Sequence, residues 1–281
     1  MASFSISDRL RELKKNLSEM AEARQQQESE VELSSVRFVT PLTILPLEAY
    51  AKHYGLTVNC AQDPDSDACR YLDTIGFQKE ATNLQSSQKS YLPIRNLPAV
   101  EENEILADYE DTIFSLAGLP KAYGLRNSLA ILTSELVANV RQHAGINHYW
   151  ILAQYYGKST NKTCEIVIAD NGRGYKKSFE GTMFEAETDA EAIQNAFEGK
   201  SSKPPEGGLL SRGYGIRHIA NTFLNGFRGK LVFISGTSVQ YYKNNTTKPS
   251  EAFELPCGWQ GSVVCINFNA RDIDAMDYIV N

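Results

Sequence analysis

Apolar residues near the start of the chain recur at alternating steps of three and four, a spacing that predicts an amphipathic helix. The stripe consists of Leu10, Leu13, Leu17 and Met20. Ser7 or Asp8 can cap the first turn, and the pattern predicts a helix from residue 7 to about residue 30. The stripe covers barely two heptads, so it fits docking on the chain's own core at least as well as a coiled-coil seam between two copies.

After residue 35 the pattern breaks into short segments. Residues 36–45 are rich in β-branched and apolar side chains, and Pro41 within them favours an edge or broken strand. Short helices are predicted at 47–54 and 67–75, and strands at 56–60 and 91–97. We therefore expect an N-terminal helix and linker over residues 1–35 and a small α/β unit of unassigned role over residues 36–100.

The longest unit, residues 101–270, alternates amphipathic segments with apolar runs. Helices are predicted at 105–116, 123–143, 186–197 and 214–224. Strands are predicted at 148–156, 164–169, 230–235, 238–242 and 262–268. Strands clustered toward one end and helices elsewhere favour an α+β sandwich in which one sheet is covered by helices. Residues 271–281 form a C-terminal tail in this division.

The second long helix of this unit carries a polar series. Glu135, Asn139 and His143 follow one another at steps of four, so a helix projects all three from one face. Asn139 can offer its carbonyl oxygen to Mg²⁺, which prefers oxygen ligands, and Glu135 can orient or deprotonate a water molecule. The apolar face that can pack on a sheet consists of Leu132, Leu136 and Val140. An ordinary helix with a solvated polar face explains the same letters.

Residues 166–174 form an apolar strand that runs into a carboxylate and two glycines. At a strand end, Asp170 can accept a hydrogen bond from an amino group such as that of adenine. Gly172 and Gly174 let the backbone turn and leave room for a flat ring. An Asp-Asn-Gly turn between two strands is the plainer reading of the same segment.

A third glycine-rich segment opens the helix predicted from residue 214. Backbone N–H groups at the start of a helix form an anion site suited to a phosphate chain, and the run here is Gly213-Tyr214-Gly215-Ile216. Residues 199–205, just before it, have the composition of a mobile lid. A flexible surface loop explains these letters too. The sequence contains no Walker motif.

Together and in this order, the three segments resemble the nucleotide-binding boxes of the GHKL superfamily, which includes gyrase-type topoisomerases, heat-shock chaperones, sensor histidine kinases and mismatch-repair ATPases. The resemblance covers roughly residues 105–268 and rests on E-L-V-A-N-V-R-Q-H-A, D-N-G-R-G-Y and G-Y-G-I. It implies a Bergerat-type α/β sandwich with a mixed sheet covered by helices, beside the smaller N-terminal α/β unit. It also implies ATP and Mg²⁺ as ligands.

The resemblance further assigns individual roles. Asn139 would ligate Mg²⁺, Asp170 would read the adenine amino group, and Glu135 would activate water. Gly172 and Gly174 would shape the adenine pocket.

The remaining assignments concern the phosphates and the last strand. The residues implied in binding under the lid are Gly213, Tyr214, Gly215 and Ile216. Ser262 stands where the family often has a threonine near adenine. One position departs from the family pattern, because Gln142 stands where many histidine kinases carry a lysine or arginine.

Composition limits the classes of partner and the cellular compartment expected for this chain. The formal charge of −6 argues against nucleic acid as the main partner, because phosphate backbones are bound by basic surfaces. The 5 cysteines, an odd number without a C-x-x-C pair, argue against a zinc site or a disulfide framework. The chain contains no apolar run near the roughly 20 residues that span a bilayer and no apolar signal core. We therefore expect a cytoplasmic protein with no membrane partner.

Three functions would use the same pocket. The first, and preferred, function is a regulatory ATPase switch in intracellular signalling. Glu135 favours chemistry over binding alone, but it does not choose between this switch and the second function. The second is a protein kinase that acts in trans on a partner, in the manner of anti-sigma-factor kinases. The third is a nucleotide-binding interaction module without turnover. A protein partner, with a second copy of this chain as one candidate, is expected in each case.

Overall fold

A computed structural model describes most of the chain. The described residues are 5–34, 36, 39–60, 66–79, 90–100, 107, 111, 123–157, 163–200, 216–217, 220–243 and 246–269. They form an α+β structure built on a five-stranded sheet. Its strands, in spatial order, are β3 (Tyr91–Pro98), β4 (His148–Tyr156), β5 (Thr163–Asp170), β7 (Glu251–Asn269) and β6 (Lys230–Lys243).

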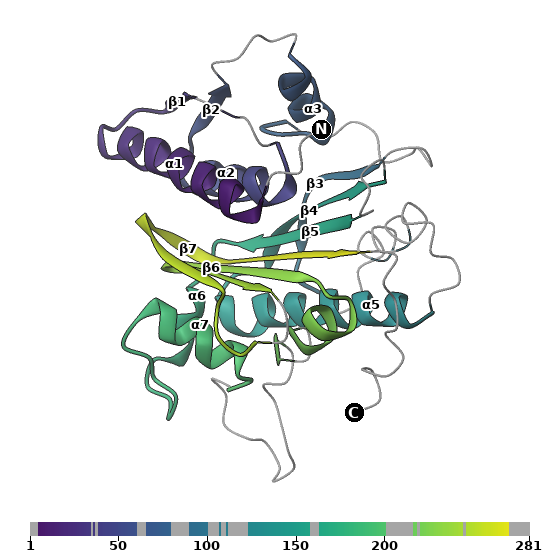
Figure 1. The fold of residues 1–281 in the computed structure, drawn as a ribbon. Helices are drawn as coiled ribbons and strands as arrows, with labels where there is room; N and C mark the ends of the chain where they lie inside the picture. Colours follow the sequence, from purple (N-terminus) through teal and green to yellow (C-terminus); the bar gives the residue numbers. More distant parts are fainter. Residues whose placement is uncertain are drawn as a thin grey trace.

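Helical segments cover both faces of this sheet (Figure 1). One face carries α5 (Tyr123–Asn139), η1 (Val140–Ala144), α6 (Gly174–Phe179), α7 (Asp189–Phe197) and η2 (Asn221–Gly226). The other face carries an N-terminal layer made of α1 (Ile6–Gln25), β1 (Glu30–Leu33), α2 (Pro41–Tyr54), β2 (Thr57–Cys60) and α3 (Asp67–Ile75). Within that layer, β1 and β2 pair in parallel as a separate two-stranded sheet.

Every neighbouring pair of strands in the five-stranded sheet is antiparallel, which corrects the mixed sheet expected from the sequence. The connections 157–162 and 244–250 are too short for the crossover that parallel neighbours need. The long connection from β5 to β6 carries α6 and α7 and does form a crossover. However, β7 returns from β6 and inserts between the two strands, so β5 and β6 run in the same direction without touching.

Both faces of the central strands are buried, and their side chains alternate between two cores. On β5, Ile166 and Ile168 pack with α5, whereas Val167 and Ala169 pack with the N-terminal layer. This two-sided burial explains why the strand reads as an unbroken apolar run rather than as an alternating one.

The predicted packing face of the long helix is confirmed. Leu132, Leu136 and Val140 are buried against the sheet. The helix continues without a break into η1, a π-helical turn that ends at Gly145, whose φ is 74°. The predicted helix at 105–116 lies outside the described residues.

The N-terminal helix is shorter than predicted. Its cap is Ser5, whose side-chain oxygen accepts from the N–H of Asp8 at 3.1 Å, and the helix ends at Gln25. The leucine stripe is buried in the chain's own core. Residues 26–29 beyond the helix are exposed, as expected of a linker, and the chain then forms β1, which pairs with β2.

The strand predicted at 36–45 is wrong, because α2 begins at Pro41. Thr40 and Thr43 form a capping box: the Thr40 N–H donates to the Thr43 hydroxyl at 3.0 Å. Pro41 at the first helical position needs no hydrogen-bond donor there. Helix α2 is buried on all sides from Pro41 to Ala51, so packing outweighs the β-propensity of its residues.

Strand β3 pairs with β4 and therefore belongs to the five-stranded sheet, not to a separate N-terminal unit. The division expected near residue 100 runs between these two paired strands. Helices α1 and α2 also bury their apolar faces on this sheet, so the N-terminal segments form a third layer over it. The tail at 271–281 lies outside the described residues.

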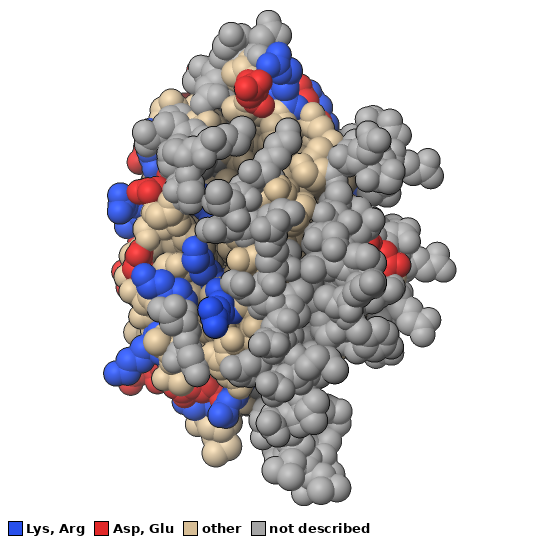
Figure 2. Space-filling view, turned by 45° about the vertical axis from the view of Figure 1, so that its right-hand side comes forward, with Lys and Arg blue, Asp and Glu red and all other residues tan. Residues whose placement is uncertain are grey.

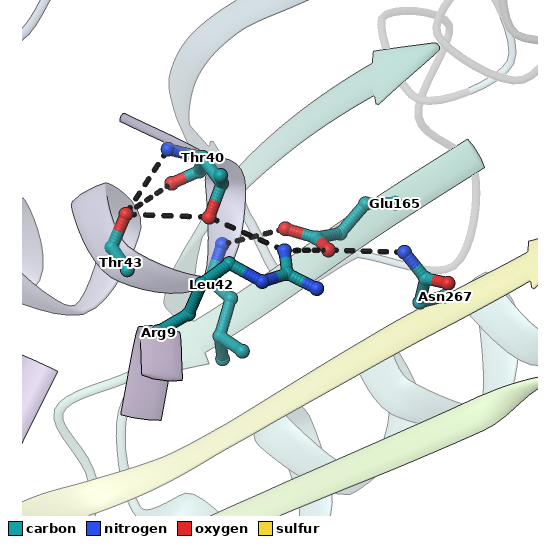
Figure 3. Close-up of polar contacts among 6 residues, drawn as sticks. All are labelled: Arg9, Thr40, Leu42, Thr43, Glu165 and Asn267. Carbon is teal, nitrogen blue, oxygen red and sulfur yellow. Dashed lines mark hydrogen bonds and ion pairs between the residues drawn. The ribbon is translucent and has the colours of Figure 1, made fainter. Parts of the chain in front are cut away.

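A buried ion pair joins this layer to the sheet (Figure 3). The Arg9 guanidinium of α1 donates to the Glu165 carboxylate of β5, and the Glu165 side chain is 0% exposed. The same carboxylate accepts from the N–H of Leu42 and from the Asn267 amide, each at 3.1 Å. Burial alone would lower the pKa of Arg9, but the charge and hydrogen bond of Glu165 outweigh it and raise that pKa.

We predict that Arg9→Met lowers the free energy of unfolding by roughly 3–5 kcal/mol, because it leaves the buried Glu165 carboxylate without its charge partner. The double variant Arg9→Met/Glu165→Gln should recover part of this loss, since it leaves no unpaired charge. Urea unfolding of the two variants and the wild type measures both effects.

The matched control is the exposed pair of α3, Arg70 and Asp67, whose side chains are 64% and 95% exposed. Arg70→Met should cost less than about 1 kcal/mol. A double variant no more stable than Arg9→Met alone would show that the unpaired charge is not the cause of the loss.

Candidate functional site

Asp170 ends β5 as a buried carboxylate that is 4% exposed. Its Oδ1 accepts from the N–H of Gly172 at 2.8 Å, and its Oδ2 accepts from the Ser262 hydroxyl. Ser262 is the register partner of Asp170 on β7, so strand pairing brings the two together. These donors occupy part of the roughly four lone-pair sites of a carboxylate.

Ser235 of β6 supports the second glycine of the loop after β5. Gly174 has a φ of 74°, and a Cβ there would lie 2.7 Å from the Ser235 hydroxyl oxygen. That hydroxyl donates to the Gly261 carbonyl at 2.8 Å and accepts from the Tyr175 N–H at 3.0 Å. The network fixes the point at which α6 begins.

The loop after β5 also touches the end of η1. The Arg173 N–H donates to the Ala144 carbonyl at 2.8 Å. A Cβ at Gly172 would overlap the backbone and methyl group of Ala144, so only glycine permits this approach. In the direction that a Cβ would take, both loop glycines thus meet protein atoms, so each permits close packing on that side.

Glu135 and Asn139 lie one helical turn apart on α5, and both are partly exposed. Their Cα atoms are separated by about 6 Å along the helix axis. Because α5 continues into η1, the segment that carries them ends directly against the loop that begins at Asp170. The structure therefore brings the first two sequence segments together.

The third segment is described only at its end. Ile216 is buried and belongs to the same core cluster as residues of α5 and η2. Gly213, Tyr214 and Gly215 lie outside the described residues, as does most of the lid segment 199–205.

The environment of Asp170 perturbs the pKa of its carboxyl group. Burial raises the pKa of its carboxyl above the ordinary value, although the hydrogen bonds from Ser262 and Gly172 and the nearby His148 act to lower it. Burial and the neighbouring Asp170 charge likewise raise the pKa of Tyr175, against a hydrogen bond with Ser262. Perturbed carboxyl groups of this kind are concentrated at functional sites.

No group of three or more His, Cys, Asp and Glu side chains within the described ranges could hold a metal ion. Figure 2 shows basic and acidic side chains next to one another at the upper and lower ends of one face. None of the helices in the described part of the chain is long and apolar enough to cross a membrane.

Sequence reasoning missed three residues around this site. Tyr175 lies within the D-N-G-R-G-Y motif and could have been found there. Ser235 belongs to a distant strand whose sequence gives no sign of the contact. Asn171 was read only as part of a turn, yet its side chain makes a buried hydrogen bond to another element.

Comparison with models of known protein families and with curated proteins gave no match for this chain.

We predict that Asp170→Asn gains stability relative to the wild type as the pH rises. The folded-state pKa of Asp170 is raised above the ordinary 3.8, so its burial penalty is fully present above that raised pKa. The penalty decreases as the pH falls through the raised folded-state pKa toward the pKa of Asp170 in the unfolded state. Urea unfolding of both proteins between pH 4 and 8 isolates this group, because all other titrations cancel in the difference. A difference that is constant, or that grows toward acid pH, would refute the burial penalty.

Proposed function

We propose that this chain binds ATP with Mg²⁺ through a GHKL-type site in a Bergerat-type fold, and acts as a regulatory ATPase switch. The observation that carries the proposal is the junction of two motif segments. The continuous helix of α5 and η1 ends against the loop after β5, and that loop begins at the buried carboxylate of Asp170.

The residues at this junction fit an adenine nucleotide. The exocyclic amino group of adenine is a hydrogen-bond donor, and Asp170 is an acceptor already oriented by Ser262 and Gly172. Burial penalises the charge of this carboxyl group, so an additional donor would be favourable there. Asp170 would thus read the base, with Ser262 fixing the orientation of the carboxylate.

Asn139 fits a magnesium ligand. Mg²⁺ usually takes only one or two protein oxygens and keeps several waters, so a site without a cluster of acidic residues suits it. The Asn139 side chain is partly exposed on α5 and so open to an incoming ligand. The bound ion would neutralise charge on the phosphates, which the resemblance assigns to Gly213, Tyr214, Gly215 and Ile216.

Glu135 would orient the attacking water and accept its proton. It lies one turn before Asn139 on the same face of α5, next to the amide assigned to the ion. A carboxylate at this position favours turnover over binding alone. A protein partner would recognise the ATP-bound state, and hydrolysis of ATP would end that state.

We predict that Asn139→Ala weakens ATP binding about tenfold or more in Mg²⁺ and leaves binding in EDTA unchanged, because only the metal contact is lost. Isothermal titration calorimetry with and without Mg²⁺ measures both values. Asn59→Ala, which removes an exposed amide of β2 in the N-terminal layer, is the matched control and should bind as the wild type does. Equal affinities of the Asn139 variant and the wild type in Mg²⁺ would refute the assignment.

We predict that Glu135→Gln slows release of inorganic phosphate from γ-labelled ATP by about 10²–10⁴-fold while ATP still binds, because a general base contributes on that scale. Phosphate release at an undiminished rate would exclude Glu135 as the base. Label retained on a protein, in the presence of candidate partners, would instead support transfer in trans.

A further inference from the structure

The end of β5 faces two ways. Side chains on a strand alternate between its faces, and on β5 the even-numbered residues face α5 whereas the odd-numbered residues face the N-terminal layer. Asp170 continues the first series and meets Ser262. Asn171, the next residue, continues the second series. Asp170 therefore faces the proposed nucleotide site, whereas its neighbour Asn171 faces the opposite side of the sheet.

The contact that Asn171 makes on that side is specific. Its amide nitrogen donates to the carbonyl oxygen of Ala49 at 2.9 Å, across 122 positions of sequence, and the bond is buried. Ala49 is 0% exposed and lies in the second half of α2. A buried side-chain amide directed at a helix carbonyl fixes the position of that helix relative to the loop.

The first turn of α2 is tied to the same strand. The N–H of Leu42 donates to Glu165 at 3.1 Å, a favourable pairing because the N-terminus of a helix carries unpaired N–H groups and partial positive charge. Glu165 also holds Arg9 of α1. Strand β5 and the residue that follows it thus contact α2 in its first turn and near its middle, and Asp170 is the last strand residue before the second contact.

We propose that α2 senses occupancy of the Asp170 site, with Asn171 as the positioning residue that transmits it; this inference rests on the proposed function. A base bound at Asp170 stabilises one arrangement of the 170–172 backbone, because Gly172 already donates to that carboxylate. The same backbone aims Asn171 at Ala49, so ligand binding strengthens the hold on α2. By linkage, a partner that stabilises the N-terminal layer raises nucleotide affinity by the same factor.

Hydrogen exchange of the α2 peptide, residues 41–54, tests the coupling in the full-length protein with and without saturating Mg-ATP. We expect ATP to slow exchange in this peptide roughly fivefold or more in the wild type. Asn171→Ala should still bind ATP but lose most of the slowing, since the loop would no longer reach Ala49.

Asn195→Ala is the matched control. Asn195 is also buried and its amide nitrogen also donates to a backbone carbonyl, that of Phe184 at 3.0 Å, but on the other face of the sheet. It should keep the full ATP response in α2, whereas a purely structural loss would affect both variants alike.

The outcomes separate the two proposals. ATP binding by calorimetry without any change in wild-type α2 exchange would overturn the coupling and leave the proposed function standing. If Asn171→Ala binds ATP and exchange in its α2 peptide slows as fully as in the wild type, Asn171 does not transmit the coupling, and its proposed role is overturned while the proposed function stands. No ATP binding by the wild type would overturn both. If Asn171→Ala does not fold, the wild-type comparison alone still decides the coupling.

Discussion

Strand β5 is covered on both sides, and each polar group attached to it needs a partner that other elements supply. From Cys164 to Asp170 all its side chains are buried, so an unpaired polar group there would cost on the order of 1–3 kcal/mol. The strand places such groups only near its ends. Glu165 is met by α1, α2 and β7, and Asp170 by β7 and its own loop. These hydrogen bonds and the ion pair fix the positions of the surrounding layers relative to β5.

The two carboxylates of β5 are satisfied in different ways. Glu165 has a guanidinium, a helix N–H and an amide as donors, which is the full compensation that a buried charge requires. Among the described residues, the hydrogen bonds to the Asp170 carboxylate come from the neutral donors Ser262 and Gly172, and its pKa is raised. The first arrangement holds layers together, whereas the second leaves a carboxyl group whose environment improves when another donor arrives. Stability is commonly given up at functional sites in this manner.

Local signals in the sequence predicted the elements that those signals control. The helix at 67–75 matches α3 because Ser66 caps its start and Gly76, with a φ of 81°, ends it. Strand β4 matches residues 148–156 because both of its faces are apolar. Thr40 caps α2, but the prediction for residues 36–45 used only their β-branched and apolar composition and Pro41. Strand β1 has only 4 residues and exists through its pairing with β2, which local sequence does not encode.

The sequence proposed the candidate site residues one by one, but it did not place them relative to one another. Motif spacing selected Glu135, Asn139 and Asp170, and register alone explains why Ser262, 92 positions away, meets Asp170. Neither the antiparallel order nor the covering of the second face could be read locally, because both depend on where β7 inserts and on where α2 packs.

The two-faced strand has a consequence for regulation that a sheet with one open face would not have. On an open face, a residue such as Asn171 would bond to water, and ligand binding on the other side would disturb nothing. Here α2 takes the place of that water. It is buried from Pro41 to Ala51 and is hydrogen-bonded at Leu42 and Ala49. A tightly packed core does not deform gradually, so a shift of the 170–172 backbone must either be resisted or be passed to α2. The N-terminal layer thus lets ligand binding on one face of the sheet be sensed by α2 on the other face.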